Sequence, residues 1–307
     1  MNMHAKKSLV DNPVIIIGSG RSGTTILSEI IFTHEHLAWP SNYQEMFPGI
    51  PQINIVRNLF ENKLWKIKGQ KPQLNKVSVF NKYLFKPAEA YKFWEKISGP
   101  AIDFSRGFLL NEKAGDAERE TIRKAFSAII KYQNKKRLAF KITGPARIGY
   151  LKSIFNEPVF INVVRKPFPT MQSWLKVDFW EDKGKSQLWW TGAYSNSEMQ
   201  WAKANADKSS LLAALQYRKL KETTENEIKK HNAKCFTVNY EDFVAKPADT
   251  VQSILDYCGL PSSNAVEKYM HRNKIFNQDK KAESKSIFSD EEKLMMNNIL
   301  ENSFSFQ

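Results

Sequence analysis

The feature that most constrains the fold of this chain is a unit of strand, glycine-rich loop and helix near its start. Residues 14–17 are four consecutive β-branched apolar residues without polar alternation. Such a run is typical of a strand covered on both faces, as in a parallel sheet. A loop with three glycines follows at residues 18–25, and residues 26–32 continue as a predicted helix. The unit therefore predicts an α/β architecture in which helices cover a parallel sheet.

The same strand pattern returns later in the chain. A short second strand is expected at residues 36–39, and longer strands are predicted at residues 138–143, 159–164 and 235–240. Helices are predicted between and after them, at residues 147–155, 250–257 and 290–301. Strands that alternate with helices predict an α/β fold with a mainly parallel sheet flanked by helices.

The chain length fits one large domain that carries insertions. We expect residues 1–307 to form a single α/β domain. Two stretches depart from the alternation of strands and helices: about 46–115, which we expect to be irregular with short helices, and about 177–232, which we expect to be helical. The second stretch contains Trp180, Trp189, Trp190 and Trp201, which we interpret as a helical core layer and not as a platform for an aromatic substrate.

Composition excludes several classes of protein. With 42% hydrophobic and 12% aromatic residues, the chain is not a disordered polyelectrolyte. No apolar run approaches the ~18 residues of a membrane-spanning helix, and the first residues lack a secretory cleavage region. Two cysteines are too few for a disulfide framework, so we expect a cytoplasmic protein. The net charge of +14 indicates an anionic partner.

The loop at residues 18–25 fits the spacing G-x-x-x-x-G-x-T of a P-loop. Its glycines let backbone N–H groups surround an oxyanion at the positive end of the following helix. A turn that binds nothing is the alternative, but the strand before it and the helix after it favour phosphate binding. Nucleoside triphosphatases place Lys where this chain has Thr24. Because the cation is Arg21 instead, the loop suits a nucleotide with a shorter reacting end than a triphosphate.

The sequence Arg21-Ser22-Gly23-Thr24-Thr25 resembles the 5′-phosphosulfate-binding loop, K/R-S-G-T-T, of sulfotransferases that use 3′-phosphoadenylyl sulfate (PAPS). The R-S-G-T-T form is common in their carbohydrate and tyrosyl-protein branches. The resemblance implies a P-loop-type sheet with PAPS as the co-substrate and the 3′,5′-bisphosphate PAP as the product. It implies no metal requirement.

Two further segments carry the same resemblance in the family's order. Arg165, Pro167 and Ser173 are similar to the family's 3′-phosphate site, R-x-P followed by Ser. Residues 240–243 and 257–261 are similar to its Y-E-D-L and F-L-G-L-P segments, although we interpret Tyr240 first as a core residue. The nucleotide-binding residues that the resemblance implies are Gly20, Arg21, Ser22, Gly23, Thr24, Thr25, Arg165, Ser173, Tyr240 and Ser286.

The resemblance also implies catalytic residues. In the carbohydrate and tyrosyl-protein branches a Glu at the place of Glu45 is the general base, and the apolar neighbours of Glu45 favour a raised pKa. An ordinary surface Glu is the alternative. Arg21 and Lys141 are candidates to stabilise the charge that develops on the leaving oxygen. Lys141 alternatively extends to the surface at the end of its strand.

Residues 61–96 suggest the kind of acceptor. They contain nine Lys and three Glu, interleaved with Trp65, Phe80, Tyr83, Phe85, Tyr91, Phe93 and Trp94. Rings beside ammonium groups suit a carbohydrate, anionic or neutral, so we expect a cytoplasmic, bacterial-type carbohydrate sulfotransferase. A solvated basic face over an aromatic core is the alternative.

Other functions remain open from sequence alone. The acceptor can be a small molecule or a peptide. A P-loop nucleotide kinase is disfavoured because this chain has Thr24 where such enzymes have Lys. A basic nucleic-acid-binding protein explains the charge but not the two paired anion sites, so no nucleic-acid partner is expected. A binding module on this fold without catalytic activity also remains open.

Overall fold

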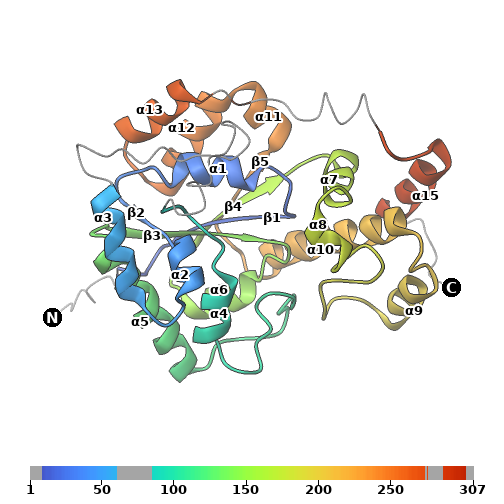
Figure 1. Ribbon diagram of the computed structural model, residues 1–307, viewed down its shortest axis with the longest axis horizontal. Coiled ribbons are helices and arrows are strands. Elements are labelled where there is room, and N and C mark those ends of the chain that lie inside the picture. Colours follow the sequence, from blue (N-terminus) through green and yellow to red (C-terminus); the bar gives the residue numbers. More distant parts are fainter. Residues whose placement is uncertain (1–8, 61–84, 274, 276–285, 302–307) are drawn as a thin grey trace.

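The computed structural model describes residues 9–60, 85–273, 275 and 286–301. In this part of the chain, five strands form one parallel sheet in the order β2-β3-β1-β4-β5 (Figure 1). Their bounds are β1 Val14–Gly18, β2 Leu37–Ala38, β3 Arg137–Thr143, β4 Val159–Val164 and β5 Cys235–Asn239. The predicted α/β fold is confirmed, although β2 is shorter than expected and Tyr240 begins a helix instead of ending a strand.

Helices cover both faces of the sheet (Figure 1). Helices α1 (Thr24–Ile31), α12 (Pro247–Cys258) and α13 (Asn264–Arg272) cover one face, and α4 (Tyr91–Ile97), α5 (Asp116–Tyr132) and α6 (Ile148–Ile154) cover the other. Val14 and Ile16 of β1 pack in the hydrophobic core on the α1 face, and Ile15 and Ile17 pack in the core on the α5 face. Because successive side chains of a strand point to opposite faces, a strand buried on both sides needs the continuous apolar run seen in the sequence.

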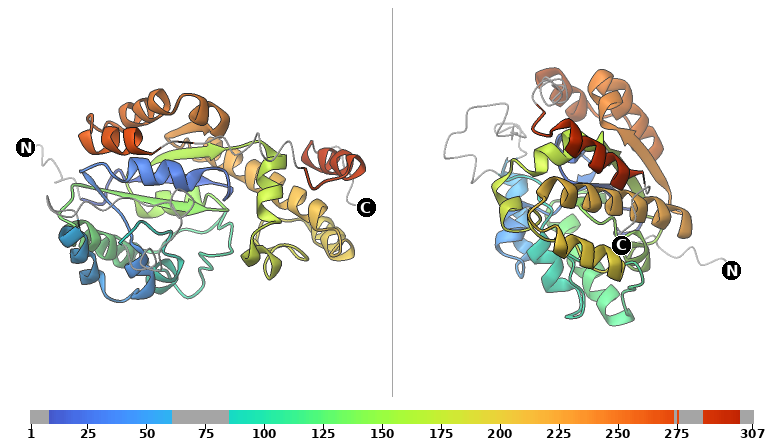
Figure 2. Two further views of the ribbon diagram at one scale, coloured as in Figure 1. Left: turned by 45° about the horizontal axis from the view of Figure 1, so that its top comes forward. Right: turned by 90° about the vertical axis from the view of Figure 1, so that its right-hand side faces the viewer.

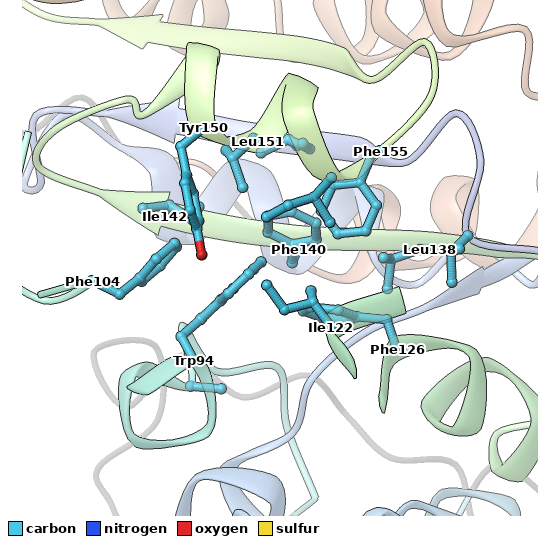
Figure 3. Close-up of a cluster of buried hydrophobic side chains, with 14 of the residues drawn as sticks. Trp94, Phe104, Ile122, Phe126, Leu138, Phe140, Ile142, Tyr150, Leu151 and Phe155 are labelled. Atoms are coloured by element: carbon cyan, nitrogen blue, oxygen red, sulfur yellow. The ribbon is translucent and has the colours of Figure 1, made fainter. Parts of the chain in front are cut away.

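The core between α4, α5, α6 and β3 is aromatic (Figure 3). The ring of Trp94 stacks on Phe104 with a centroid distance of 4.2 Å, and Phe126 packs on Phe140 at 5.5 Å. Phe85, Phe93 and Trp94 are at most 1% exposed. The suggestion that the rings of residues 61–96 contact a carbohydrate is therefore wrong for these three, because Phe93 and Trp94 fill this core and Phe85 fills the core on the α1 face. Trp65, Phe80 and Tyr83 lie outside the described residues.

A separate helical block packs at one end of the sheet (Figure 2). It contains α7 (Pro167–Trp174), α8 (Asp178–Glu181), α9 (Asn196–Ala204), α10 (Ser209–Lys230) and α15 (Asp290–Leu300). Trp174, Trp180 and Trp190 pack together inside it, with ring centroids 5.1 to 5.7 Å apart. Trp189 and Trp201 pack against this cluster half-buried, which confirms the interpretation of these tryptophans as a core layer.

The remaining described elements follow β2 and β5. They are α2 (Asn42–Met46), the 3₁₀ helix η1 (Pro51–Ile55), α3 (Val56–Phe60) and α11 (Tyr240–Ala245). None of the described helices is both long and apolar enough to cross a membrane.

Candidate active site

The loop between β1 and α1 is bent by left-handed backbone conformations. Gly20, Arg21 and Gly23 have φ of 55°, 58° and 95°, and Gly20 donates its N–H to the Gly18 carbonyl at 2.9 Å. Gly23 caps the N-terminus of α1, and a Cβ atom there would lie 2.4 Å from the ring of Tyr240. Only glycine fits such a position. The loop therefore turns backbone N–H groups at the start of α1 toward an anion.

The side chains of the loop divide into two groups. Ser22 and Thr24 are buried, and a Cβ on Gly18 would lie 2.8 Å from the Ser22 Oγ and the Thr24 Cγ2 atoms. These two side chains face β1, so only their backbone N–H groups can reach a phosphate. Ser22 Oγ has no hydrogen-bond partner among the described residues. Thr25, in contrast, is exposed at the first turn of α1.

The two predicted arginines meet at this loop. Arg165 follows β4 and donates its Nη1 to the Arg21 carbonyl at 2.7 Å, with its guanidinium 4.5 Å from the ring centre of Tyr240. Arg21 donates its Nε to Ser173 Oγ at 2.9 Å. Ser173 thus pairs with Arg21, whereas the family resemblance implied that it shares the 3′-phosphate site with Arg165. Partial burial and the nearby cation of Arg165 both lower the pKa of Arg21. Such a lowered pKa is expected where two cations lie close together without an anion between them.

The helical block supports the site with residues that sequence reasoning missed. Trp174 donates its Nε1 to the Gly20 carbonyl at 3.1 Å. Tyr217 of α10 donates its hydroxyl to the Arg165 carbonyl at 2.6 Å. Both side chains donate hydrogen bonds to backbone carbonyl groups of the anion site. The helical block therefore fixes the backbone just after β1 and just after β4. Tyr240, only 3% exposed, is a core residue that also underlies Gly23 and Arg165.

Lys141 of β3 reaches the loop from the neighbouring strand. Its Nζ donates to Thr25 Oγ1 at 3.1 Å and pairs with the Glu89 carboxylate at 3.0 Å. Glu89 also accepts a hydrogen bond from Thr143 Oγ1 at 2.7 Å. Glu89 was not singled out in the sequence, where nothing distinguishes it from the surrounding charged residues.

Glu45 lies in α2 and is half-buried. Its Oε2 accepts the backbone N–H of Lys92 at 2.9 Å, at the start of α4. Burial raises the pKa of Glu45, although the hydrogen bond from Lys92 opposes the shift. The described contacts of Glu45 are therefore with α4, and the carboxylate that contacts Lys141 is Glu89.

Ser286 lies before α15 and is exposed. Its Oγ accepts the Phe288 N–H at 3.3 Å within its own turn, and the ring of Phe288 packs on Phe168 of α7 at 6.1 Å. A contact between Ser286 and the nucleotide stays a prediction. In the described ranges, no three His, Cys, Asp or Glu side chains gather as a metal site would require.

Comparison with known proteins identifies the family. The family model described as "Sulfotransferase family" matches residues 13–264. This chain belongs to the sulfotransferase family. The match spans the loop, Lys141, both arginines and the Y-E-D-F segment. A PAPS-dependent sulfotransferase needs sites for a 5′-phosphosulfate and a 3′-phosphate, and the glycine loop with its two guanidinium groups fits them. No match was found among curated proteins.

Several solved structures are similar to this chain at low sequence identity, and the first of those named here shows the same fold. Sulfotransferase STF9 from Mycobacterium avium has a TM-score of 0.57 at 14% identity, covering 97% of this chain and 78% of that one. The sulfotransferase domain from the curacin biosynthetic pathway has a TM-score of 0.48 at 12% identity, covering 96% and 99%. Sulfotransferase STF1 from Mycobacterium tuberculosis H37Rv has a TM-score of 0.45 at 16% identity, covering 95% and 77%.

Proposed function

We propose that this sulfotransferase transfers the sulfuryl group of PAPS to a hydroxyl group of a carbohydrate, with Glu45 as the general base. The observation that carries the nucleotide part is the convergence of Arg21, Ser173 and Arg165 on one glycine loop. Arg165 is assigned to the 3′-phosphate, and the N-terminus of α1 with Thr25 is assigned to the 5′-phosphate. A guanidinium group suits the 3′-phosphate because it can donate two parallel hydrogen bonds to phosphate oxygens, and a helix N-terminus suits the 5′-phosphate because its backbone N–H groups are free to bind an anion.

The transfer forms a bond between the acceptor oxygen and sulfur and breaks the bond between sulfur and the bridging oxygen of PAPS. The electron pair stays on the bridging oxygen, which leaves as the 5′-phosphate of PAP. Arg21, Lys141 and the loop N–H groups are assigned to stabilise that charge, and one such donor contributes ~3 kcal/mol in comparable sites. Glu45 is assigned to accept the proton of the acceptor hydroxyl.

Two properties of Glu45 support its assignment. Burial raises its pKa, which brings a carboxylate closer to the strength of an effective general base at neutral pH. Its side chain is only half-buried, so an acceptor hydroxyl can reach it. Lys92, whose backbone N–H binds this carboxylate, belongs to the basic segment that suggested the carbohydrate acceptor.

The described lysines near α2 support a carbohydrate that carries negative charge. Lys92 and Lys96 are exposed on α4, and Lys86 lines a cavity of about 50 Å³ together with Lys141 and Thr25. The other six lysines of the basic segment lie at residues 61–84, outside the described residues. The proposal also places the enzyme in a bacterial cytoplasm, where the free thiols of Cys235 and Cys258 stay reduced.

The proposal is tested by measuring PAP release from PAPS with three panels of acceptors: acidic polysaccharides, neutral oligosaccharides, and phenols or tyrosyl peptides. We expect turnover with carbohydrates and the highest rates with acidic ones. Turnover confined to phenols or peptides would move the protein to the alternative acceptor classes. Magnesium-dependent phosphoryl transfer from ATP would instead support the alternative function of a nucleotide kinase.

A further inference from the structure

A partly buried ion pair joins two segments that lie far apart in the sequence, at the edge of the phosphate-binding loop. Lys141 enters from β3, whose register places it beside Ile16 of β1. Glu89 enters from the segment before α4. Only 13% of the Lys141 side chain and 21% of the Glu89 side chain are exposed. Pairs held this far from water are stronger and more precisely placed than surface pairs.

The geometry around the pair restricts where the ammonium group can lie. Lys141 Nζ is 3.0 Å from Glu89 Oε1 and 3.1 Å from Thr25 Oγ1. An ammonium group has three N–H donors, so these two contacts leave one for a ligand oxygen. Because Thr25 lies in the first turn of α1, where the 5′-phosphate is assigned, the Lys141 ammonium lies beside the expected 5′ end of the nucleotide.

The carboxylate itself is fixed by the fold. The backbone before it pairs with the segment after β2, through hydrogen bonds from Ala88 N to the Pro40 carbonyl and from Asn42 N to the Lys86 carbonyl, both 2.9 Å. Thr143 Oγ1 donates to Glu89 Oε2 at 2.7 Å. Burial by itself would raise the pKa of Glu89, but Lys141 and the hydrogen bond from Thr143 outweigh burial and hold the pKa below its ordinary value. Glu89 is therefore a fixed anion at neutral pH.

We propose that Glu89 is a positioning residue for sulfuryl transfer, whose carboxylate holds the Lys141 ammonium beside Thr25 so that Lys141 donates to the departing bridging oxygen. The inference rests on the proposed role of Lys141. It assigns Glu89 a part that differs from that of Glu45, because Glu89 binds a cation and Glu45 binds a backbone N–H. A group that must be held for the transition state contributes to kcat more than to ground-state affinity.

The test compares Glu89→Gln, Lys141→Met and the double variant. Glu89→Gln keeps the size of the side chain and removes its charge. We expect kcat to fall by about 10- to 100-fold, the range that misplacement of a catalytic group produces. The dissociation constant for PAPS, measured without acceptor, should change much less, because the bridging oxygen gains its charge only as the sulfuryl group departs. The double variant should be no slower than Lys141→Met alone, because a residue that acts through Lys141 has no effect once Lys141 is removed.

Two further variants make the result specific. Glu89→Asp keeps the charge and should recover part of the lost kcat. Glu118→Gln is the matched control: its carboxylate accepts hydrogen bonds from Gly99 N and Tyr150 Oη, both at 2.7 Å, on the α5 side of the core. Glu118→Gln should leave kcat unchanged, and its free energy of unfolding shows how much stability a Glu→Gln change at a hydrogen-bonded carboxylate costs.

The possible failures are distinguishable. Normal kcat in Lys141→Met would refute the proposed role of Lys141. A slow Lys141→Met with a normal Glu89→Gln would overturn only the role of Glu89. Losses that multiply in the double variant would show that Glu89 acts without Lys141. A Glu89→Gln variant that loses PAPS affinity as strongly as kcat, and is not rescued by Asp, would show a merely structural residue.

Discussion

At the scale of single residues, the site combines two cations that repel one another, Arg21 and Arg165, with a carboxylate, Glu45, that is partly desolvated. Arg21 and Arg165 are joined through a backbone carbonyl, and the Arg165 cation contributes to the lowered pKa of Arg21. Such an arrangement is costly without an anion and favourable with one. The affinity for a bisphosphate is therefore expected to depend on individual guanidinium groups.

Replacing Arg165 by Ala should weaken PAP binding by roughly 10- to 100-fold, since a hydrogen bond to a charged group contributes about 1.5–3 kcal/mol. Calorimetric titration with PAP measures the effect. AMP, which lacks the 3′-phosphate, is the control ligand, and its affinity should change much less. An equal loss for AMP and PAP would mean that Arg165 only holds the loop through the Arg21 carbonyl.

Replacing Glu45 by Ala should lower kcat by about 10²- to 10⁴-fold, the usual contribution of a general base, while PAP binding is retained. A protonated carboxyl cannot accept a proton, so wild-type activity should fall as the pH drops through the pKa of Glu45. Because burial raises that pKa, the fall should begin at a higher pH than for an ordinary Glu. Near-normal activity in the variant would remove Glu45 from the mechanism. Glu120→Ala, on the exposed surface of α5, is the control.

At the scale of elements, the loop between β1 and α1 depends on a close approach to α11. The ring of Tyr240 lies where a side chain of residue 23 would be, and Arg165 packs on the same ring. A change at Gly23 therefore reaches both anion sites at once. Trp174 and Tyr217 add hydrogen bonds from α7 and α10 to the same backbone.

Gly23→Ala should destabilise the protein and also weaken PAP binding, because the new methyl group displaces Tyr240. Gly192→Ala is a matched control: its φ is 91°, against 95° at Gly23, and a Cβ there would meet nothing within 4 Å. The control should show only the backbone strain of a left-handed residue, roughly 1–2 kcal/mol, with normal PAP affinity. Denaturant unfolding and calorimetry measure the two effects. Equal behaviour of the two variants would contradict the role given to Tyr240.

At the scale of the whole molecule, the nucleotide site draws on several layers of the structure. The loop comes from β1 and α1, the 3′-phosphate arginine follows β4, Ser173 comes from the helical block and Tyr240 from α11. A ligand that binds only this assembled arrangement stabilises the folded state as a whole.

PAP at a hundred times its dissociation constant should therefore stabilise the protein by ~2.7 kcal/mol, which raises the melting temperature by several degrees. Calorimetric or fluorescence melting measures this shift, and AMP at the same concentration should produce a smaller one. A larger shift with ATP than with PAP would contradict the bisphosphate site.

Much of the fold was predictable because its signals are local. A buried parallel strand needs a continuous apolar run, and β1, β3 and β4 were found within one residue of their predicted bounds. The loop was predictable because left-handed turns and close contacts require glycine, as at Gly20 and Gly23. Ser173 and Arg21 were both candidates, but their hydrogen bond was not predicted, since helical spacing along α7 says nothing about a loop 152 positions away.

The sequence by itself determined the α/β sheet, the phosphate-binding loop and the pair of arginines that carry the family resemblance, because each depends on residue types at short spacings. Tertiary structure alone decided that Phe93 and Trp94 fill the core and that Ser22 and Thr24 face inward. It alone brought Glu89 to Lys141. The physical reason is that burial and ion pairing depend on which segments a fold brings together, and spacing along the chain does not encode that for residues far apart.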